Sequence, residues 1–275
     1  MLVGGIMDNV TGMFDDINGK VEGIASHVGA TPQSWNSGIY NMVRTLSDNI
    51  ILPIAGVILA IVMTLELIQM ITDRNNMHDT DTWMFFKWIF KTACAVLIVT
   101  NTWNIVMGVF DAAHSVVSSA SGIISYDTSI GFVSNIAEFQ AALMAKDVGH
   151  LLGLWFQSLI VRIAMWVMSI CIMLVCYGRM IEIYLVTSLA PIPLATAVNR
   201  EWGQTGQNYL RSLLALAFQG FLIIICVAIY AVLLQAIVIN EDIAAAMWTC
   251  AGYTVLLCFT LFKTGSLSKS LFNAH

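Results

Sequence analysis

Five long apolar stretches divide this chain and set its predicted architecture. They are Ile50–Ile71, Thr92–Phe110, Leu151–Gly178, Ser212–Ile239 and Ile243–Phe262. Each is close to or longer than the about 20 residues that an α-helix needs to cross the hydrocarbon core of a bilayer. The pattern therefore predicts an all-α fold, a polytopic transmembrane helical bundle with about five spans.

A sixth apolar stretch, Ile183–Val198, is interrupted by Pro191 and Pro193. Both prolines lack the N–H that an unbroken helix requires, and the stretch is short for a span. We expect a broken or re-entrant Pro-x-Pro segment that enters and leaves on one side, a geometry tolerated where protein or water satisfies the backbone. A tilted short crossing is the alternative.

The basic residues predict an orientation, because Lys and Arg in loops usually remain in the cytoplasm. With five spans and the N-terminus outside, the inner side receives Arg74, Lys87, Lys91, Arg179, Arg200, Arg211, Lys263 and Lys269. The outer side receives Lys20, Arg44 and Lys146, and Arg162 remains within a span. If the sixth stretch crossed the membrane fully, Arg200 and Arg211 would lie outside, and the excess of basic residues on the inner side would be lost. We therefore predict a multi-pass membrane protein with its N-terminus outside and its C-terminus in the cytoplasm.

Three predicted regions follow from these spans. Residues 1–49 form an extracellular N-terminal amphipathic region, 50–262 the transmembrane bundle, and 263–275 a cytoplasmic tail. In the first region Val3, Ile6, Val10 and Met13 recur at helical spacing, which predicts a helix that lies on the bilayer, packs on the spans or docks a partner. Within the bundle, 111–150 is predicted to be a loosely structured outer loop and 179–211 the cytoplasmic-side broken segment.

Composition and motifs narrow the function. Hydrophobic residues make up 58% of the chain and charged residues 11%, with a mean hydropathy of +0.80, which excludes a soluble globular domain. The six cysteines all fall in apolar stretches, the five histidines lack metal-ligand spacing, and no phosphate-binding loop or nucleophile elbow is present. We predict no enzyme activity, no metal and no cofactor, and no basic stripe indicates a tight nucleic-acid site.

Polar residues within the apolar stretches are candidates for function, because a charge in hydrocarbon costs at least about 2.5 kcal/mol. Glu66 and Lys91 lie at similar depth near the cytoplasmic ends of the first two spans, so we expect a structural ion pair. Arg162 lies near the middle of the third span, level with Asn101, Thr102 and Asn104 of the second, which offer acceptors. Arg162, Asn101 and Asn104 are candidate channel residues, and bundle packing through hydrogen bonds is the alternative.

The segment from Arg179 to Arg211 carries the most specific signal. It reads RMIEIYLVTSLAPIPLATAVNREWGQTGQNYLR, an apolar run broken by Pro-Ile-Pro and followed by Trp202, Gly203 and Gly206. The longer run EIYLVTSLAPIPLATAVNREWGQTGQNYLRSLLALAFQGFLI resembles the TrbL-type conjugal transfer proteins of Gram-positive mobile elements. These are relatives of the polytopic inner-membrane channel subunit of type IV secretion systems. The runs ELIQMITDRNNMHDTDTWMFFKWIFKT, NTWNIVMGVFDAAHSVV and LPIAGVIL are similar to the same family.

This resemblance implies a multi-pass subunit of the bacterial cell membrane within a conjugative type IV secretion machine. The implied partners are a secretion ATPase, other membrane subunits and further copies of the chain, with transient contact to single-stranded DNA and its relaxase as the exported cargo. Pro191, Pro193, Trp202, Gly203 and Gly206 then become a candidate gate near the cytoplasmic entrance, where Trp202 stacks on a base or anchors the loop at the headgroups. The alternatives are a passive scaffold and a secondary transporter or permease with a broken-helix substrate site.

Overall fold

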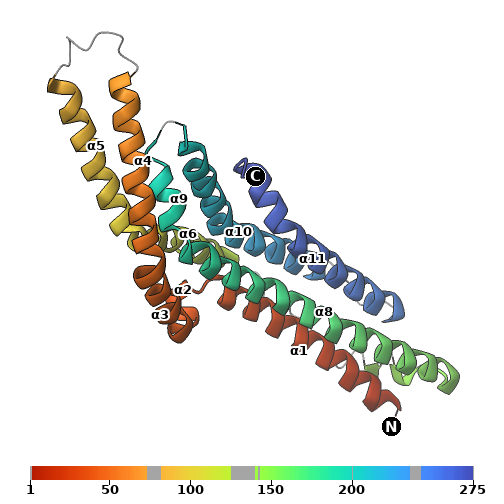
Figure 1. Cartoon of the computed structure of the whole chain (residues 1–275). Coiled ribbons are helices and arrows are strands. Elements are labelled where there is room, and N and C mark those ends of the chain that lie inside the picture. Colours follow the sequence, from red (N-terminus) through yellow and green to blue (C-terminus); the bar gives the residue numbers. More distant parts are fainter. Residues whose placement is uncertain are drawn as a thin grey trace. The chain divides into compact units, whose positions relative to one another are not determined.

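The computed structural model describes residues 2–72, 82–124, 140–141, 143–199, 201–235 and 243–274. Every regular element in these ranges is a helix, which confirms the predicted all-α fold (Figure 1). The elements are α1 (Leu2–Val28), α2 (Pro32–Trp35), α3 (Ser37–Leu46), the π-helical turn η1 (Ser47–Ile51), α4 (Leu52–Thr72), α5 (Thr82–Thr100), α6 (Thr102–Ile124), α8 (Val148–Ser188), α9 (Pro191–Thr196), α10 (Gly203–Gln235) and α11 (Ile243–Leu271).

Five helical segments of the described chain are long and apolar enough to cross a membrane. They are Ser37–Thr72, Trp83–Thr100, Val148–Ser188, Gly203–Leu234 and Ala244–Leu271. The predicted polytopic bundle with about five spans is confirmed in number and order, and the first span is continuous with α3 because η1 joins α3 to α4 without a break.

The chain divides into two compact units. The first comprises Met1–Gly29, Ser115–Gly178 and Gln219–Gly265. Its core is a cluster of aliphatic and sulfur-containing side chains in which Ile6 of α1, Ile223 of α10 and Cys250 of α11 are completely buried. The helix predicted at the N-terminus is therefore present as α1, and it lies along α8 with one stripe buried (Figure 1).

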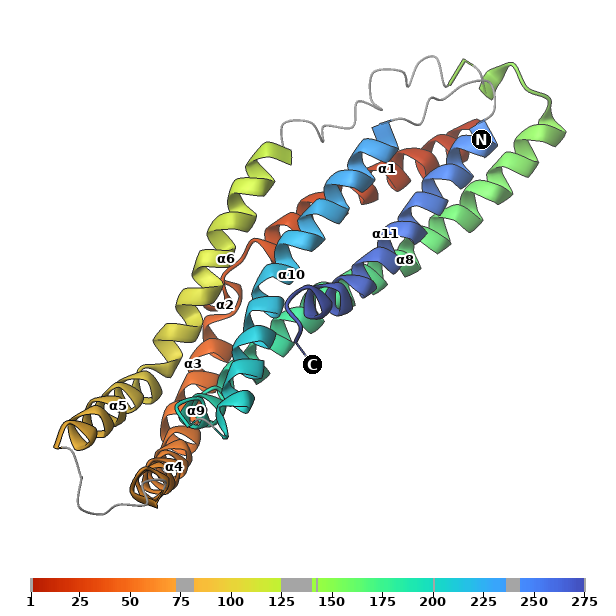
Figure 2. The ribbon, with the colours of Figure 1, turned by 90° about the horizontal axis from the view of Figure 1, so that it is seen from above.

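Within the first unit, α10 and α11 run side by side (Figure 2). The hydroxyl groups of Tyr230 and Thr254 are 2.7 Å apart, and Gln219 Nε2 donates to Thr264 Oγ1 at 3.4 Å. Both pairs are buried, so each satisfies polar groups that would otherwise be costly inside a helical bundle.

The second unit comprises Ala30–His114, Arg179–Phe218 and Ser266–His275. Here α4 and α5 lie side by side, and the short α9 packs against both of them (Figure 1). Three alanines, Ala55, Ala95 and Ala195, are buried where these helices meet. Small side chains at this contact let the three backbones approach closely, as is common between membrane helices.

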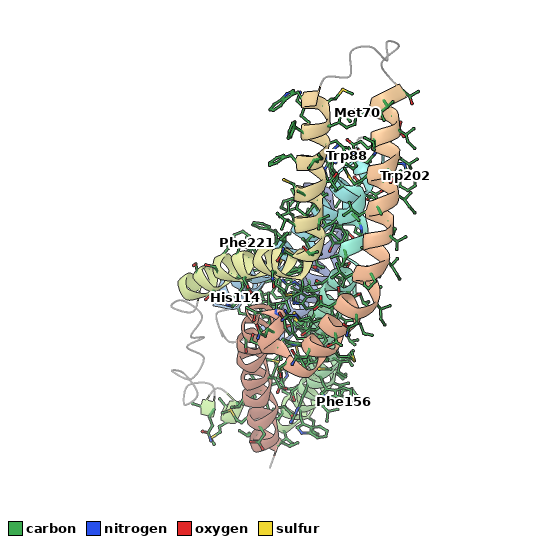
Figure 3. The ribbon with its side chains drawn as sticks, turned by 60° about the vertical axis from the view of Figure 1, so that its left-hand side comes forward. Met70, Trp88, His114, Phe156, Trp202 and Phe221 are labelled. Carbon is green, nitrogen blue, oxygen red and sulfur yellow. The ribbon has the colours of Figure 1, made fainter. Side chains whose placement is uncertain are left out.

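The predicted second span, Thr92–Phe110, is wrong in its boundaries. The helix bends at Asn101, so that α5 ends at Thr100 and α6 begins at Thr102 (Figure 3). Asn101 Nδ2 donates to Leu97 O at 2.9 Å, and Thr100 Oγ1 and Thr102 Oγ1 donate to Val96 O and Val99 O at 2.8 Å. Side chains that bond to carbonyls of the preceding turn compete with the backbone and bend helices.

Other helix ends also differ from the predicted ones. α8 continues beyond Gly178 to Ser188, because Arg179 and Glu182 interrupt the apolar run without stopping a helix. α11 continues beyond Phe262 to Leu271, so most of the segment predicted as a cytoplasmic tail is helical. α6 extends to Ile124, so the start of the expected outer loop is helical, whereas 125–139 lie outside the described residues.

Candidate functional site

The chain turns back between α8 and α10 through a segment that we call the proline elbow (the described residues 189–199 and 201–202). Pro191 has no N–H to donate to Thr187 O, and the N–H of Ala190 donates to this carbonyl instead at 3.2 Å. In the same way Pro193 cannot reach Leu189 O, which accepts from Ile192 N–H at 3.2 Å. Pro191 and Pro193 therefore end α8 and form the first turn of α9, where N–H groups have no intrahelical partner.

Two glycines allow α10 to begin directly against the end of α9. A Cβ placed on Gly206 would lie 2.3 Å from Ala197 Cβ and 2.7 Å from Pro193 O, distances that no side chain tolerates without movement. A Cβ on Gly203 would lie 3.1 Å from Ala197 O. Both glycines are buried, so the predicted group of Pro191, Pro193, Gly203 and Gly206 is brought together in one closely packed turn.

Asn199 holds the turn that leads into α10. Its Oδ1 accepts hydrogen bonds from the N–H groups of Glu201 at 2.7 Å and Trp202 at 3.2 Å, and the residue is only 4% exposed. The side chain thereby satisfies backbone donors ahead of α10, as an Asx turn does. Trp202 itself is 50% exposed, so its ring projects from the elbow rather than filling it.

Most of the proline elbow is buried within the second unit, to which it belongs. Ala190 and Ala195 are completely buried, and Leu194 is 4% exposed. Ala195 packs in one cluster with Leu59 and Met63 of α4 and Val99 of α5, and Tyr209 Oη of α10 donates to Val186 O of α8 at 3.2 Å. These contacts hold the turn against its neighbours. Beside it lies an exposed surface that we call the polar rim, which consists of Glu201, Trp202, Gln204 and Gln207.

A charged pair and an indole connect α4 to α5 beside this cluster. Lys91 Nζ contacts Glu66 Oε1, so the structure brings the two predicted partners together. One turn earlier, Trp88 Nε1 donates to Met63 O at 3.1 Å, and Figure 3 shows Trp88 between the two helices. The pair is partly exposed, 38% for the Lys91 side chain and 21% for Glu66.

Arg162 has a different partner from the one expected. Its Nη1 donates to Asn9 Oδ1 of α1 at 2.9 Å, and Asn9 Nδ2 donates in turn to Ser158 Oγ of α8 at 3.0 Å. Asn101 bonds to its own helix, and Asn104 lies on the exposed side of α6. The acceptor is therefore Asn9 of the N-terminal helix, whose packing partner the sequence left open, and not a residue of the second span.

Sequence reasoning also missed an aromatic cluster that holds α2 and α3. Tyr184 Oη of α8 donates to Pro32 O at 2.6 Å, and Trp103 Nε1 of α6 donates to Tyr40 Oη at 2.9 Å. Trp35 lies with its ring 6.0 Å from that of Tyr184. Trp and Tyr usually find a hydrogen-bond partner when buried, so polar-tipped aromatic residues within apolar runs were the available signal.

The described residues contain no group of three or more His, Cys, Asp or Glu side chains that could hold a metal ion. Five apolar helices, an elbow built from prolines and glycines, and polar residues paired between helices define a multi-pass α-helical membrane protein. Its sequence matches the family described as TrbL/VirB6 plasmid conjugal transfer like protein over residues 17–191, well over half of the chain. The chain belongs to this family.

The match begins within α1 and ends at Pro191. It therefore covers the α4–α5 pair, the bend at Asn101 and Arg162, whereas α10 and α11 lie beyond it. No curated protein and no solved structure gives a significant match. Membership makes the chain a multi-pass membrane subunit of a conjugal transfer system, within a type IV secretion complex that contains other subunits.

Proposed function

We propose that this chain is a channel or scaffold subunit of a conjugative type IV secretion machine that exports single-stranded DNA with its relaxase. The observation that carries the proposal is the family match over residues 17–191, combined with five helices able to span a membrane. The sequence carries no phosphate-binding loop of the form Gly-x-x-x-x-Gly-Lys-Ser/Thr, so the proposal assigns the energy for transport to a separate secretion ATPase.

The proposed orientation places the N-terminus outside and the C-terminus in the cytoplasm of a bacterial cell. The charge bias of the loops supports it, since it leaves most Lys and Arg inside. In this orientation the proline elbow lies at the cytoplasmic side.

In this proposal the elbow presents its polar rim to the ATPase or to the arriving strand. The rim residues Glu201, Trp202, Gln204 and Gln207 are exposed, whereas the turn behind them is buried. A well-packed support with an exposed aromatic ring suits a docking surface, because little conformational freedom of the backbone is lost on binding. Pro191 and Pro193 then hold the rim in place and do not themselves open and close.

The test is conjugation from donor cells that lack this protein, complemented with variants that carry a photo-crosslinking residue at Trp202, Gln207 or Arg162. Loss of transfer without the protein, restored by the parent chain, is expected. Crosslinks from position 202 or 207 to the transferred strand would make the rim part of the route, and crosslinks to protein alone would make the chain a scaffold. Undiminished transfer in the deletion strain would reject the conjugative role.

A further inference from the structure

Long helices pass from one compact unit of the chain to the other. The chain changes unit at 29/30, 114/115, 178/179, 218/219 and 265/266, which lie after α1 and within α6, α8, α10 and α11. We call these five positions the unit junctions. α8 is continuous through its junction, with 41 residues from Val148 to Ser188. At about 1.5 Å per residue it is roughly 60 Å long, about twice the thickness of a hydrocarbon core.

A glycine lies within two residues of four of the five unit junctions. These glycines are Gly29 after α1, Gly178 in α8, Gly220 in α10 and Gly265 in α11. Glycine accounts for only 19 of the 275 residues, so its presence at four junctions exceeds what its frequency alone would give. Glycine weakens the interior of a helix relative to alanine, because it has more backbone freedom to lose. The long helices are therefore locally weakened where one core gives way to the other.

Packing within the chain does not explain the glycine of α8. A Cβ on Gly265 would lie 3.3 Å from Gln219 Nε2, so a close neighbour accounts for the glycine of α11. Gly178 is exposed, and a Cβ there would meet nothing within 4 Å. Alanine would fit at position 178 and would strengthen the helix. A glycine that weakens a helix without making room for a neighbour points to bending as its role.

Each unit holds its own parts of α10 and α11 together. In the first unit, Gln219 Nε2 donates to Thr264 Oγ1 at 3.4 Å. In the second unit, Ser268 Oγ donates to Ala215 O at 2.5 Å. The two helices are therefore joined on both sides of their junctions, so each unit can move as one body while bending is confined to the junctions.

We propose that Gly178 is a hinge in α8, about which the two units change their relative orientation. Gly220 and Gly265 take up the matching bend in α10 and α11, and Gly29 does so after α1. A hinge of this kind is a small number of positions that absorb a change in backbone angles. The proline elbow belongs to the second unit, so a partner that binds the polar rim can reorient the first unit through α8. The hinge does not depend on the proposed conjugative role.

The test measures distances along α8 in the full chain, reconstituted in lipid nanodiscs, by double electron–electron resonance. Spin labels at the exposed positions Val167 and Leu185 lie on either side of Gly178, and labels at Phe156 and Leu174 form a reference pair within the first unit. Both pairs are 18 residues apart, so a straight helix separates each by about 27 Å along its axis. Labels on genetically encoded ketone side chains leave the six native cysteines unmodified.

We expect the distance distribution of the 167/185 pair to be at least about twice as wide as that of the 156/174 pair, because only the first pair includes the hinge. Gly178→Ala should narrow the 167/185 distribution to the width of the reference pair. Gly153→Ala is the matched control, since Gly153 is an equally open and exposed position of α8 within the first unit, and it should leave the distribution unchanged.

Equal widths for the two pairs in the parent protein would overturn the hinge, and this comparison needs no substitution at Gly178. A 167/185 distribution that stays broad in Gly178→Ala would overturn it as well, because the bend would then lie elsewhere. Neither result bears on conjugation, so the hinge and the proposed function succeed or fail separately.

Discussion

At the scale of single residues, the packing of helices depends on a few positions where only a residue of one size or one hydrogen-bonding capacity fits. Gly206 is one, because Ala197 occupies the space into which a side chain would project. Asn9 is another, since its amide accepts from Arg162 and donates to Ser158 at once. Neither residue has an apolar side chain to bury, and each determines how two helices fit together.

Gly206→Ala should destabilise the protein by about 1–3 kcal/mol, the range of an overpacked core site, because α9 and α10 must separate to admit the methyl group. Gly56→Ala in α4 is the matched control, since a Cβ there meets nothing within 4 Å. Thermal unfolding of the detergent-purified variants measures the difference. Equal midpoints for the two variants would mean that the close contact at Gly206 does not exist.

Asn9→Ala should loosen α1, because the Arg162 guanidinium loses its acceptor and Ser158 its donor. The expected cost is about 0.5–1.5 kcal/mol, the net contribution of a typical hydrogen bond, because the Arg162–Asn9 contact is exposed to solvent. Limited proteolysis of the N-terminal helix in membranes provides the measurement, with Asp8→Ala as the control because Asp8 is exposed on the same helix. Identical cleavage of both variants would contradict the Asn9–Arg162 contact.

At the scale of elements, short interruptions organise long helices. The two prolines separate α8 from α10, and three backbone-directed side chains around Asn101 separate α5 from α6. A distinct helix follows each interruption. α9 packs against α4 and α5, and α6 has one buried side and one exposed side with several polar residues.

Replacing Pro191 and Pro193 together with Ala restores two N–H donors and allows α8 to continue past Ser188. We expect conjugation to fall at least about tenfold while the amount of protein in the membrane fraction stays near that of the parent, because the elbow positions the rim and insertion depends on hydrophobicity. Pro53→Ala, an exposed proline at the start of α4, is the control. Full transfer with both prolines replaced would remove the elbow from the mechanism.

Lys91→Met leaves the Glu66 carboxylate without its cation. The expected loss is about 1–2 kcal/mol, less than for a fully buried pair because both side chains are partly exposed. The double variant with Glu66→Gln should recover most of this loss, since no charge is then unpaired. A double-mutant cycle of thermal stabilities tests the pair, and additive losses would show that the two groups do not interact.

At the scale of the whole molecule, apolar length sets which helices can cross the membrane, and loop charge predicts their orientation. Five helical segments can cross it, and the bias of basic residues predicts which side each loop faces. The two compact units each draw on α6, α8, α10 and α11, so neither unit is a separate stretch of sequence.

Reporter fusions test this orientation. A fluorescent protein that matures only in the cytoplasm should be bright after residue 274, and a secreted phosphatase should be active when it precedes residue 2 or is inserted at 145, because few basic residues occupy the predicted outer side. A bright insertion at 145 together with a dark C-terminal fusion would reverse the proposed topology.

The sequence predicted which helices form better than it predicted the residues at which they begin and end. The span count, the interruption at Pro191 and Pro193, and the meeting of Glu66 with Lys91 were all readable, because each follows from hydropathy, backbone chemistry or charge. The extension of α8 was not, since Arg179 and Glu182 end an apolar run without ending a helix. The bend at Asn101 depends on side-chain bonds to the preceding turn that hydropathy does not register.

The sequence by itself determined that this is an all-α, multi-pass membrane protein, because apolar length and proline position act locally along the chain. Only the tertiary structure decided that Asn9 accepts a hydrogen bond from Arg162 and that Ala197 excludes a side chain at Gly206. It also decided that one side of α6, with several polar residues, is exposed. Each of these depends on which distant segments become neighbours. From the sequence alone, many residues could pair with an arginine or pack against a small residue. The close packing of the folded chain selects one of them.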